Sequence, residues 1–474
     1  MTDARVLVTP ARRRPTPVLV AVAHGQVVGE VLHRGTGRDY TFVYRDDWRF
    51  AADAFPLSLS MPLAQAEAPP GAALAFLWGL LPDNDRVLTR WAQRFGVSPN
   101  NPVGLLAHVG EDCAGAVQFV TPERADGLLA AQQPADALGR VDDGAVRWLD
   151  EGEVAERLRD LLQDPATTRL PGDAGQFSLA GAQPKTALLS WQGRWGVPSG
   201  RVPTTHILKP PALERELDVG GLVENEHCCL ALVGALGLTA AASRVARFED
   251  QVAIAVLRYD RFVRGDRILR IHQEDACQAL SVHPANKYEA DGGPGAADVA
   301  ALLRTYSTRA AVDVRRFLCM LGVNWIIAGT DAHAKNYGLL LGTRGEVRLA
   351  PFYDVLNALP YPKRMPIQKI KLAMRVGREH QVQRTGARQW REMADAILTD
   401  GGPEALGGWD AAALLDQLLA LCTRVPDEAA AVRQRAVADG LDPEVVTRWA
   451  DAITARAALC ARQLRESGTG VRAE

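Results

Sequence analysis

The stretch "DAHAKN" at residues 331–336 decides the fold that we expect for this chain. Asp331 precedes Asn336 by five positions, and Asp354 follows a segment, "YGLLLGTRGEVRLA", that reads as two short strands. Protein kinases place a catalytic Asp, a metal-binding Asn and a second metal-binding Asp in this order and spacing. Phosphoryl transfer requires a carboxylate near the attacking hydroxyl and oxygen ligands for Mg²⁺. We therefore predict an ATP- and Mg²⁺-dependent kinase in which Asp331, Asn336 and Asp354 are catalytic, the last two as metal ligands.

The same loop has less specific features. Asp331 and Asn336 alone would also fit a surface loop that caps a helix, and Asp354 argues against that alternative. His333 has an imidazole that titrates near neutral pH, so a general base or a metal ligand is open, but we favour a role in orienting the loop. We assign His333 and Lys335 to the predicted ATP site.

A second group of residues, upstream, is predicted to hold the nucleotide. The small-residue turn after Ser178 lets backbone N–H groups approach a phosphate closely, because glycine has no side chain. The turn fits neither the Walker pattern nor the kinase G-x-G-x-x-G pattern, so a plain hairpin turn is the alternative. Lys209 and Glu226 fit the strand-lysine and helix-glutamate pair of kinases, with an ordinary surface salt bridge as the alternative. The predicted phosphate loop consists of Ala180, Gly181, Ala182, Gln183, Pro184 and Lys185.

Composition bounds the class of protein. Hydrophobic residues make up 47% and charged residues 23% of the 474, which is typical of an ordinary globular protein with several packed units. The formal net charge of −2 argues against DNA coating by the whole surface. Seven cysteines without a CxxC pair favour a reducing, cytoplasmic location over a disulfide framework or a zinc site. No run of eighteen uncharged apolar residues occurs, so we expect no membrane span.

The patterns along the chain predict an α+β, two-lobed, protein-kinase-like fold with an additional N-terminal unit. Residues 15–122 read as a small α+β module, residues 145–262 as a β-rich lobe with the phosphate loop, and residues 263–474 as a helical lobe with the catalytic loop. We expect one helical stretch over residues 72–95, and helices at residues 151–162, 312–327 and 411–422. The segment "FSLAGAQPKTALLSW" reads as strand, glycine turn and strand. A ligand is expected in the cleft between the lobes.

Two basic segments have open interpretations. Nine Lys and Arg and one acidic residue, Glu379, lie between Lys363 and Arg391. This segment could contact nucleic acid phosphates, form a solvated face or dock an acidic protein. The second cluster, after the predicted hinge, contains acidic residues as well and fits a structural role. It comprises Arg258, Arg261, Arg264, Arg267 and Arg270.

Together the motifs resemble the HipA family of serine/threonine kinase toxins of bacterial toxin–antitoxin pairs. The resemblance covers most of the chain. Its N-terminal part rests on "PLSLSMPL", "LWGLLPDNDRVLTRWAQRFG" and "LLAHVGEDCAGAVQF". The rest follows in the family's order as "FSLAGAQPKTALL", "THILKPP", "VENEHCCLALVGALGL", "IHQEDACQAL", "KYEADGGPG", "GTDAHAKNYGLLL" and "APFYDVLNALP".

The resemblance implies roles for individual residues. Lys209 would contact ATP phosphates, with Glu226 orienting it, and Ser178 would be autophosphorylated, which expels the phosphate loop and inactivates the enzyme. Adenine would be held by the hinge formed by Leu257, Arg258 and Tyr259. Leu257 replaces an acidic residue that is frequent in the family, which puts the adenine contacts in doubt. Likewise, the proline of the phosphate loop replaces a more usual acidic residue and would stiffen the loop.

The resemblance also implies partners: a helix-turn-helix antitoxin that binds DNA, and a protein substrate of the tRNA-charging enzyme class. The alternatives are a catalytically weak co-repressor that bridges DNA-bound antitoxin dimers, and a kinase for a small molecule or a lipid. The intact set of Asp331, Asn336 and Asp354 argues against a purely structural role.

Overall fold

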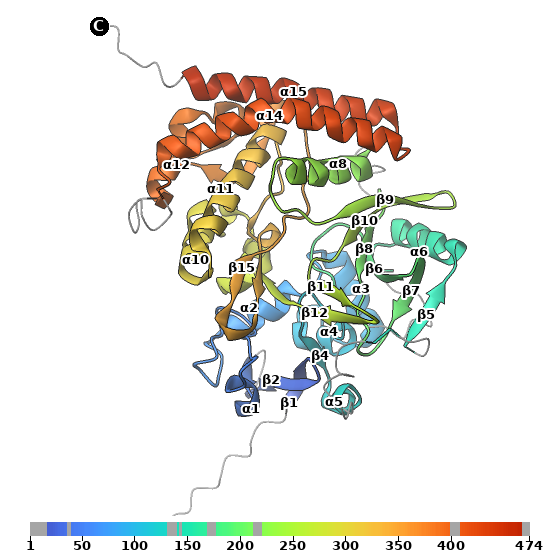
Figure 1. The fold of residues 1–474 in the computed structure, drawn as a ribbon. Helices are drawn as coiled ribbons and strands as arrows, with labels where there is room; N and C mark the ends of the chain where they lie inside the picture. Colours follow the sequence, from blue (N-terminus) through green and yellow to red (C-terminus); the bar gives the residue numbers. More distant parts are fainter. Residues whose placement is uncertain are drawn as a thin grey trace, which may run out of the picture.

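The computed structural model describes residues 17–35, 39–129, 140–141, 145–167, 177–211, 220–398 and 408–466. The expected outer limits at residues 15 and 474 lie outside these ranges. We refer to residues 17–129 as the N-terminal module, to residues 145–270 as the β-lobe and to residues 272–466 as the helical lobe. Figure 1 shows the N-terminal module at the bottom, the β-lobe to the right and α14 and α15 at the top.

The N-terminal module is an antiparallel sheet, in the order β3-β2-β1-β4, covered by short helices around its own apolar core. The expected helix over residues 72–95 is two helices. Pro82 lacks a backbone N–H, and Asn84 caps the second helix by accepting from the N–H groups of Arg86 and Val87. The elements are β1 (Pro17–Ala23), β2 (Gln26–His33), β3 (Tyr40–Tyr44), α1 (Asp46–Arg49), α2 (Ala72–Gly79), α3 (Asp85–Phe95), α4 (Pro102–Val109), β4 (Gln118–Val120) and α5 (Pro122–Leu129).

The β-lobe contains a six-stranded sheet in the order β5-β7-β6-β8-β10-β9, followed by a separate hairpin of β11 and β12. Only the second of the two strands expected around the glycine turn forms, as β6. The first arm leaves this sheet because Phe177 pairs with Asp112 of the N-terminal module. The elements are β5 (Val146–Leu149), α6 (Glu151–Gln163), β6 (Thr186–Trp191), β7 (Arg194–Pro198), β8 (His206–Lys209), α8 (Leu222–Ala235), β9 (Ser243–Phe248), β10 (Gln251–Leu257), β11 (Arg261–Arg264) and β12 (Arg267–Arg270).

The helical lobe packs long helices beside a three-stranded sheet, β13-β14-β15, and a hairpin of β16 and β17. The helix expected over residues 411–422 continues through Pro426 to Ala438, because its buried stripe of Leu418, Val425 and Ala429 continues past the proline. The elements are β13 (His272–Asp275), α9 (Ala276–Ala279), α10 (Ala296–Tyr306), α11 (Ala310–Ile327), β14 (Gly338–Leu341), β15 (Val347–Leu349), β16 (Lys371–Val376), β17 (Glu379–Gln381), α12 (Ala387–Leu398), α14 (Ala411–Ala438) and α15 (Pro443–Glu466).

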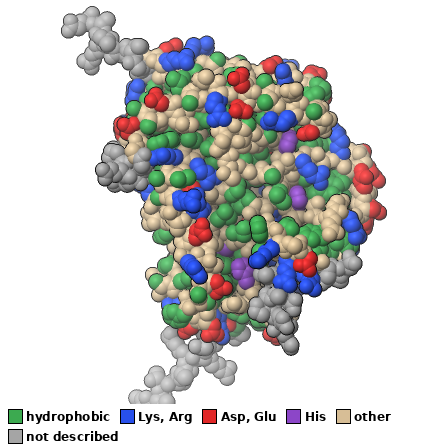
Figure 2. Space-filling model, in the orientation of Figure 1, with side chains coloured by type: hydrophobic (Ala, Val, Ile, Leu, Met, Phe, Trp, Pro, Cys, Tyr) green, Lys and Arg blue, Asp and Glu red, His purple; other side chains and the backbone are tan. Residues whose placement is uncertain are grey.

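One large apolar core joins the two lobes. Helix α8 packs against β9 and β10 on one side and against α14 and α15 on the other, so its residues belong to the core of the helical lobe. In Figure 1, α8 lies between the strands β9 and β10 and the helices α14 and α15. On the face in Figure 2, Lys and Arg side chains lie among Asp and Glu side chains, in keeping with the formal net charge of −2. Among the described helices, none is long and apolar enough to cross a membrane.

Candidate active site

A cleft of about 320 Å³ brings together residues from the N-terminal module and both lobes. Fifteen of the seventeen residues assigned to the site from sequence line this cleft, and Pro184 and Ser178 do not. The fifteen are Ala180, Gly181, Ala182, Gln183, Lys185, Lys209, Glu226, Leu257, Arg258, Tyr259, Asp331, His333, Lys335, Asn336 and Asp354. Gly79, Asp83 and Ala114 contribute the wall on the N-terminal side.

A charged triad lies at the back of the cleft. Lys209 on β8 contacts Glu226 of α8 at 2.7 Å and Asp354 at 2.8 Å, each distance joining Nζ to a carboxylate oxygen. The Lys209 and Glu226 side chains are 7% and 2% exposed, whereas Asp354 is 26% exposed. Burial would lower the pKa of Lys209, but Asp354 and Glu226 reverse the effect and raise it. Burial likewise would raise the pKa of Asp354, and Lys209 lowers it well below its usual range.

Asp354 has an unusual backbone. Its φ of 57° lies in the left-handed region, which costs energy for a residue other than glycine. The hairpin of β14 and β15, which the sequence predicts, shortly precedes Asp354 in the chain. An observed strain at a carboxylate that faces a cleft is a frequent sign of a functional position.

The catalytic loop is stabilised by its own hydrogen bonds. Asn336 Nδ2 donates to Asp331 O at 2.5 Å, and the backbone N–H of Asn336 donates to His333 O. Asp331 keeps its carboxylate accessible, with the side chain 47% exposed. Tyr288 Oη donates to Asp331 Oδ1 at 2.7 Å. The loop therefore presents one carboxylate and one amide to the cleft in a fixed relation.

His333 and Lys335 have different surroundings. The His333 ring is buried and packs edge-on against Tyr288, and burial lowers the pKa of His333, which favours a neutral ring. Lys335 Nζ donates to Gly79 O at 3.2 Å and lies 3.4 Å from Asp275 Oδ2 and 3.5 Å from Asp83 Oδ1. Its ammonium thus contacts carboxylates of the cleft wall, and Lys335 lines the cleft as the assignment to the ATP site requires.

The phosphate loop is folded against the N-terminal module. Gly181 has a φ of 102°, a conformation that residues with a side chain rarely adopt, so glycine is favoured at this position. Lys185 Nζ donates to Ala180 O at 2.7 Å, and burial together with Lys209 lowers the pKa of Lys185 to about 8. Pro184 lines a small cavity behind the loop. Ser178 is fully buried, and its hydroxyl donates to Leu80 O at 2.7 Å.

Arg258 is the hinge residue whose surroundings differ from those expected for a contact with adenine. Arg258 donates from its backbone N–H to Thr205 O and accepts at its carbonyl from Arg261, so its backbone groups are committed. Its guanidinium contacts Asp260 at 2.9 Å, away from a ligand in the cleft. Leu257 is partly exposed beside the cleft, and Tyr259 stacks on Tyr353 with ring centroids 5.6 Å apart. Arg258 therefore shapes the cleft wall without offering it a polar group.

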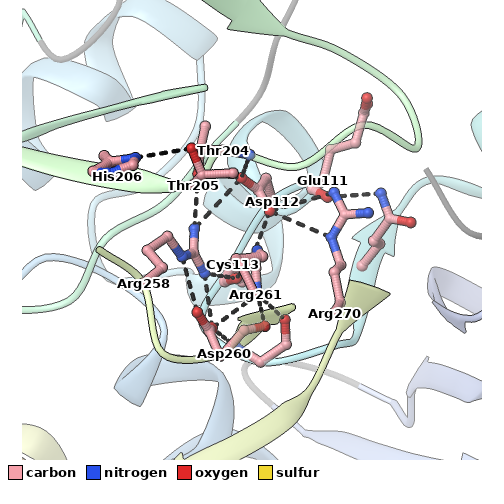
Figure 3. Close-up of polar contacts among 12 residues, drawn as sticks. Glu111, Asp112, Cys113, Thr204, Thr205, His206, Arg258, Asp260, Arg261 and Arg270 are labelled. Atoms are coloured by element: carbon pink, nitrogen blue, oxygen red, sulfur yellow. Dashed lines mark hydrogen bonds and ion pairs between the residues drawn. The ribbon is translucent and has the colours of Figure 1, made fainter. Parts of the chain in front are cut away.

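The arginine cluster after the hinge is partly a buried network around Asp112 (Figure 3). Asp112 lies 2.8 Å from Arg261, 3.3 Å from Arg270 and 3.5 Å from Arg258, and Thr204 Oγ1 donates to it at 2.6 Å. Burial would raise the pKa of Asp112, but the three guanidiniums hold it far below its usual range. The structural interpretation holds for these three arginines, which attach the hinge to the N-terminal module.

Most of the basic residues between Lys363 and Arg391 are exposed. Eight of the nine are exposed, and Arg391 is partly buried. Arg375 contacts Glu289 at 2.8 Å, and Arg388 contacts Glu392 at 3.0 Å. The segment includes β16 and β17. Because these side chains are exposed, the segment is accessible to a partner.

Sequence reasoning missed the residues that other parts of the chain bring to the cleft. Asp83 and Tyr288 lie in motifs that were quoted for the resemblance, but nothing in their local pattern indicates a contact with the catalytic loop. Asp112 was also quoted and not singled out. A sharper signal was present at "LLPDN", where a proline and an N-cap residue mark a turn between two helices.

Comparisons with known proteins cover most of the chain. The family described as HipA N-terminal domain matches residues 19–120, and the family described as HipA-like C-terminal domain matches residues 177–425. Putative kinase Y4mE of Sinorhizobium fredii is 36% identical over 78% of this chain and 83% of its own length. The serine/threonine-protein kinase toxin HipA of Shewanella oneidensis is 28% identical over 71% of this chain and 74% of its own length.

A solved structure has the same fold. The complex of HipA, HipB and operator DNA from Shewanella oneidensis MR-1 superposes with a TM-score of 0.75 at 24% identity, covering 94% of this chain and 98% of that chain. At this identity the likeness concerns the fold, which is the expected α+β kinase-like fold. The family match over residues 177–425 and the 36% identity to a relative decide the relationship. This chain belongs to the HipA family of kinases.

Proposed function

We propose that this protein is an ATP- and Mg²⁺-dependent serine/threonine protein kinase that acts as the toxin of a toxin–antitoxin pair. The observation that carries the proposal is the triad of Lys209, Glu226 and Asp354, which shares one cleft with Asp331 and Asn336. This is the set of side chains that phosphoryl transfer requires. A relative is named a serine/threonine-protein kinase toxin, which supports a serine or threonine hydroxyl as the acceptor of the phosphoryl group.

The chemistry follows from the positions of the side chains. Asp331 accepts the proton of the substrate hydroxyl, and Tyr288 holds this carboxylate in place. Lys209 presents its ammonium to phosphate oxygens, because Glu226 and Asp354 hold it from behind. The Leu257 and Tyr259 segment receives the adenine. When bound, ATP would supply the transferable phosphoryl group, and Mg²⁺ would offset the negative charge of the phosphates and of Asp354.

The donor set suits Mg²⁺. Asn336 offers an amide oxygen and Asp354 a carboxylate, which are hard ligands of the kind that Mg²⁺ prefers. Among the described residues no cluster of three or more His, Cys, Asp or Glu could hold a metal by itself. A metal at Asn336 and Asp354 would complete its coordination with water and phosphate oxygens, as is usual for Mg²⁺ beside a nucleotide.

Ser178 is the proposed site of self-inactivation. Its hydroxyl is buried against Leu80 O, so the phosphate loop must leave its present position before Ser178 can react. A phosphate on Ser178 would add up to about two negative charges at a buried position that has no room for hydrated oxygens. The loop could then not return, which removes part of the ATP site.

The test is incubation of the purified protein with Mg²⁺ and γ-labelled ATP, followed by peptide mass spectrometry of Ser178. We expect one phosphate on Ser178 in the wild type and none in Asp331→Gln, with nucleotide binding retained in both. Ser178→Ala should remain able to phosphorylate an added protein substrate. Wild-type protein that binds ATP but transfers no phosphate to any protein hydroxyl would refute the proposal. Transfer to a lipid or a small molecule instead would support that alternative.

The proposed partners are a helix-turn-helix antitoxin, bound mainly through the N-terminal module, and a protein of the tRNA-charging class as substrate. The three-unit division at residues 15–122, 145–262 and 263–474 is part of this proposal. The likeness to a chain from a complex with HipB and operator DNA supports an antitoxin beside DNA.

A second candidate function, co-repression, rests on the exposed basic segment between Lys363 and Arg391. DNA contact by this segment would release counterions, so binding of the antitoxin complex to its operator should weaken steeply with salt. Replacing Lys369 and Lys371 by Gln should reduce the salt slope by about one unit per phosphate contact that is lost. An unchanged slope would exclude DNA contact by these lysines.

A further inference from the structure

Three parts of the cleft meet at one carboxylate of the N-terminal module. Asp83 lies in the turn between α2 and α3, and its side chain is 10% exposed. Its Oδ2 lies 2.8 Å from Lys287 Nζ, and its Oδ1 lies 3.5 Å from Lys335 Nζ. The backbone N–H of Asp83 donates to Gly181 O at 3.1 Å. This residue therefore contacts the phosphate loop, the catalytic loop and the loop that precedes α10.

The residues beside Asp83 extend the contact with the phosphate loop. Pro82 and Gly181 form a parallel β-bridge, and Asn84 Nδ2 donates to Ala182 O at 3.3 Å. Upstream, the backbone N–H of Ser178 donates to Asp112 O. The N-terminal module thus supports the loop from behind with polar contacts, while Leu179 just upstream packs against Ala187 and Ile207 of the β-lobe.

Through Lys287 and the neighbouring Tyr288, Asp83 is also linked to the catalytic carboxylate of Asp331. The N–H of Ala334 in the catalytic loop donates to Lys287 O, and the next residue, Tyr288, donates its hydroxyl to Asp331. Burial would raise the pKa of Asp83, but Lys335 and Lys287 lower it, so the carboxylate stays ionised between the two ammonium groups. An ionised, buried carboxylate with two lysines fixes the positions of both loops more firmly than a neutral contact would.

We propose that Asp83 is a positioning residue that aligns the phosphate loop with the catalytic loop, so that the N-terminal module completes the active site. The proposal rests on the proposed function only for the role of the two loops. Asp83 contacts the two lysines with its side chain and the Gly181 carbonyl with its backbone N–H, so its role is to position the two loops. Misplacement of reacting groups by about 1 Å can reduce turnover by about 100-fold.

The experiment compares Asp83→Asn with the wild type of the full chain. The substitution keeps the backbone N–H and the size of the side chain but removes the charge. We expect kcat to fall by about 10- to 100-fold and the KM for ATP to rise several-fold. Amide hydrogen exchange of the peptide covering residues 177–186, measured without nucleotide, should become about tenfold faster, because loss of the two ion pairs loosens the turn whose backbone N–H holds Gly181.

Two control variants separate positioning from general stability. Asp85→Asn changes an exposed carboxylate two residues away in the same segment, and should leave kcat, KM and loop exchange unchanged. Ser58→Ala removes a buried hydroxyl that donates to Glu274 between the same module and the helical lobe, away from the cleft. It should lower the unfolding midpoint without changing loop exchange.

The outcomes are decisive in both directions. If Asp83→Asn lowers only the unfolding midpoint, as Ser58→Ala does, Asp83 is structural and the proposal is wrong. If Asp83→Asn does not fold, Lys287→Met removes the same ion pair from the other side, and unchanged kcat and loop exchange in that variant would refute the proposal. If the wild type transfers no phosphate but Asp83→Asn still accelerates loop exchange, the kinase function fails while the support of the loop stands.

Discussion

The network around Asp112 and the triad around Lys209 are both buried groups of acidic and basic side chains, but they differ in what is left unpaired. In the Asp112 network, three guanidiniums surround two carboxylates, and every side chain is less than a tenth exposed. In the triad, two carboxylates share the ammonium of Lys209, and Asp354 reaches the cleft. In the first group both carboxylates are saturated by guanidiniums, whereas in the second an accessible carboxylate oxygen retains negative charge.

From this difference we expect the Asp112 network to stabilise the fold and the triad to serve the chemistry. A saturated buried network fixes geometry, and removal of one member leaves other charges buried without a partner. A triad with excess negative charge beside a cleft can accept a cation without rearrangement. The two groups should therefore respond in opposite ways to the loss of one aspartate, in stability for Asp112 and in activity for Asp354.

Asp354→Asn is expected to have the largest effect, and this effect is on activity. Loss of the carboxylate removes a metal ligand, so phosphate transfer should fall by about 10³-fold. Stability should change by no more than about 1 kcal/mol, because Lys209 keeps Glu226 and asparagine tolerates the left-handed φ of 57° better than most residues. Label transfer and urea unfolding measure the two quantities, with exposed Asp427→Asn on α14 as control. A loss of stability without a loss of transfer would contradict the comparison.

Asp112→Asn is expected to show the opposite pattern. The three arginines would keep fewer buried acceptors than they need, so unfolding free energy should drop by about 3–5 kcal/mol. In the folded protein at low temperature, the catalytic residues remain in place, so kcat should fall far less than in Asp354→Asn. Asp266→Asn is a matched control, because its ion pair with Arg140 is exposed and should contribute at most about 1 kcal/mol. Urea unfolding curves that coincide for both variants would show that the network does not stabilise the hinge.

The same contrast explains what the sequence could predict. Spacing within one segment indicated Asp331, Asn336 and Asp354, because the loop and the hairpin of β14 and β15 are consecutive in the chain. Lys209 and Glu226 were also found, since a strand followed by a helix has a local signature. Their contact with Asp354 follows from the order of kinase elements, not from the local pattern itself.

The residues missed by sequence reasoning act across long separations. Asp112 and Arg258 are 146 positions apart, and Asp83 and Lys287 are 204 positions apart. Hydrophobic periodicity carries no information about such pairs, because it reports only which face of an element is buried. The N-terminal module was thus predicted as a separate unit for partner contact, while its side chains also line the cleft.

Glu226→Gln tests whether Glu226 and Asp354 have separate roles in the triad. The variant removes the buried carboxylate but leaves Asp354 both to pair with Lys209 and to bind the metal. We expect kcat to decrease by about 10- to 100-fold, less than in Asp354→Asn, because only the orientation of Lys209 is affected. The amide can still accept from Lys209, so the fold should persist. Steady-state kinetics with varied ATP measures the effect, and a loss as large as that of Asp354→Asn would show that the two carboxylates act as a unit.

Glu274 offers the smallest and most specific test. Among the residues that the structure describes, this buried carboxylate accepts hydrogen bonds but has no ion-pair partner. Ser58 Oγ donates to it at 2.5 Å and the N–H of Leu59 at 2.8 Å. Burial, together with Asp275, raises the pKa of Glu274 to about 8. In the unfolded chain a glutamate titrates near about 4.3. The folded state therefore holds a proton that the unfolded state has released, and the stability from this group is present below pH about 4.3 and is lost as pH rises towards about 8.

Glu274→Gln keeps a neutral side chain at every pH, so the loss with rising pH should disappear. Relative to the wild type, the variant should gain stability between pH 5 and pH 9, with most of the change below about pH 8. Urea midpoints of both proteins at pH 5, 7 and 9 measure this difference. A difference that stays constant with pH would mean that Glu274 is ionised in the folded state, as Asp112 is, and that hydrogen bonds from Ser58 and Leu59 are sufficient to hold a buried charge. Hydrogen bonds from neutral groups would then stabilise a buried carboxylate, as the arginines do for Asp112.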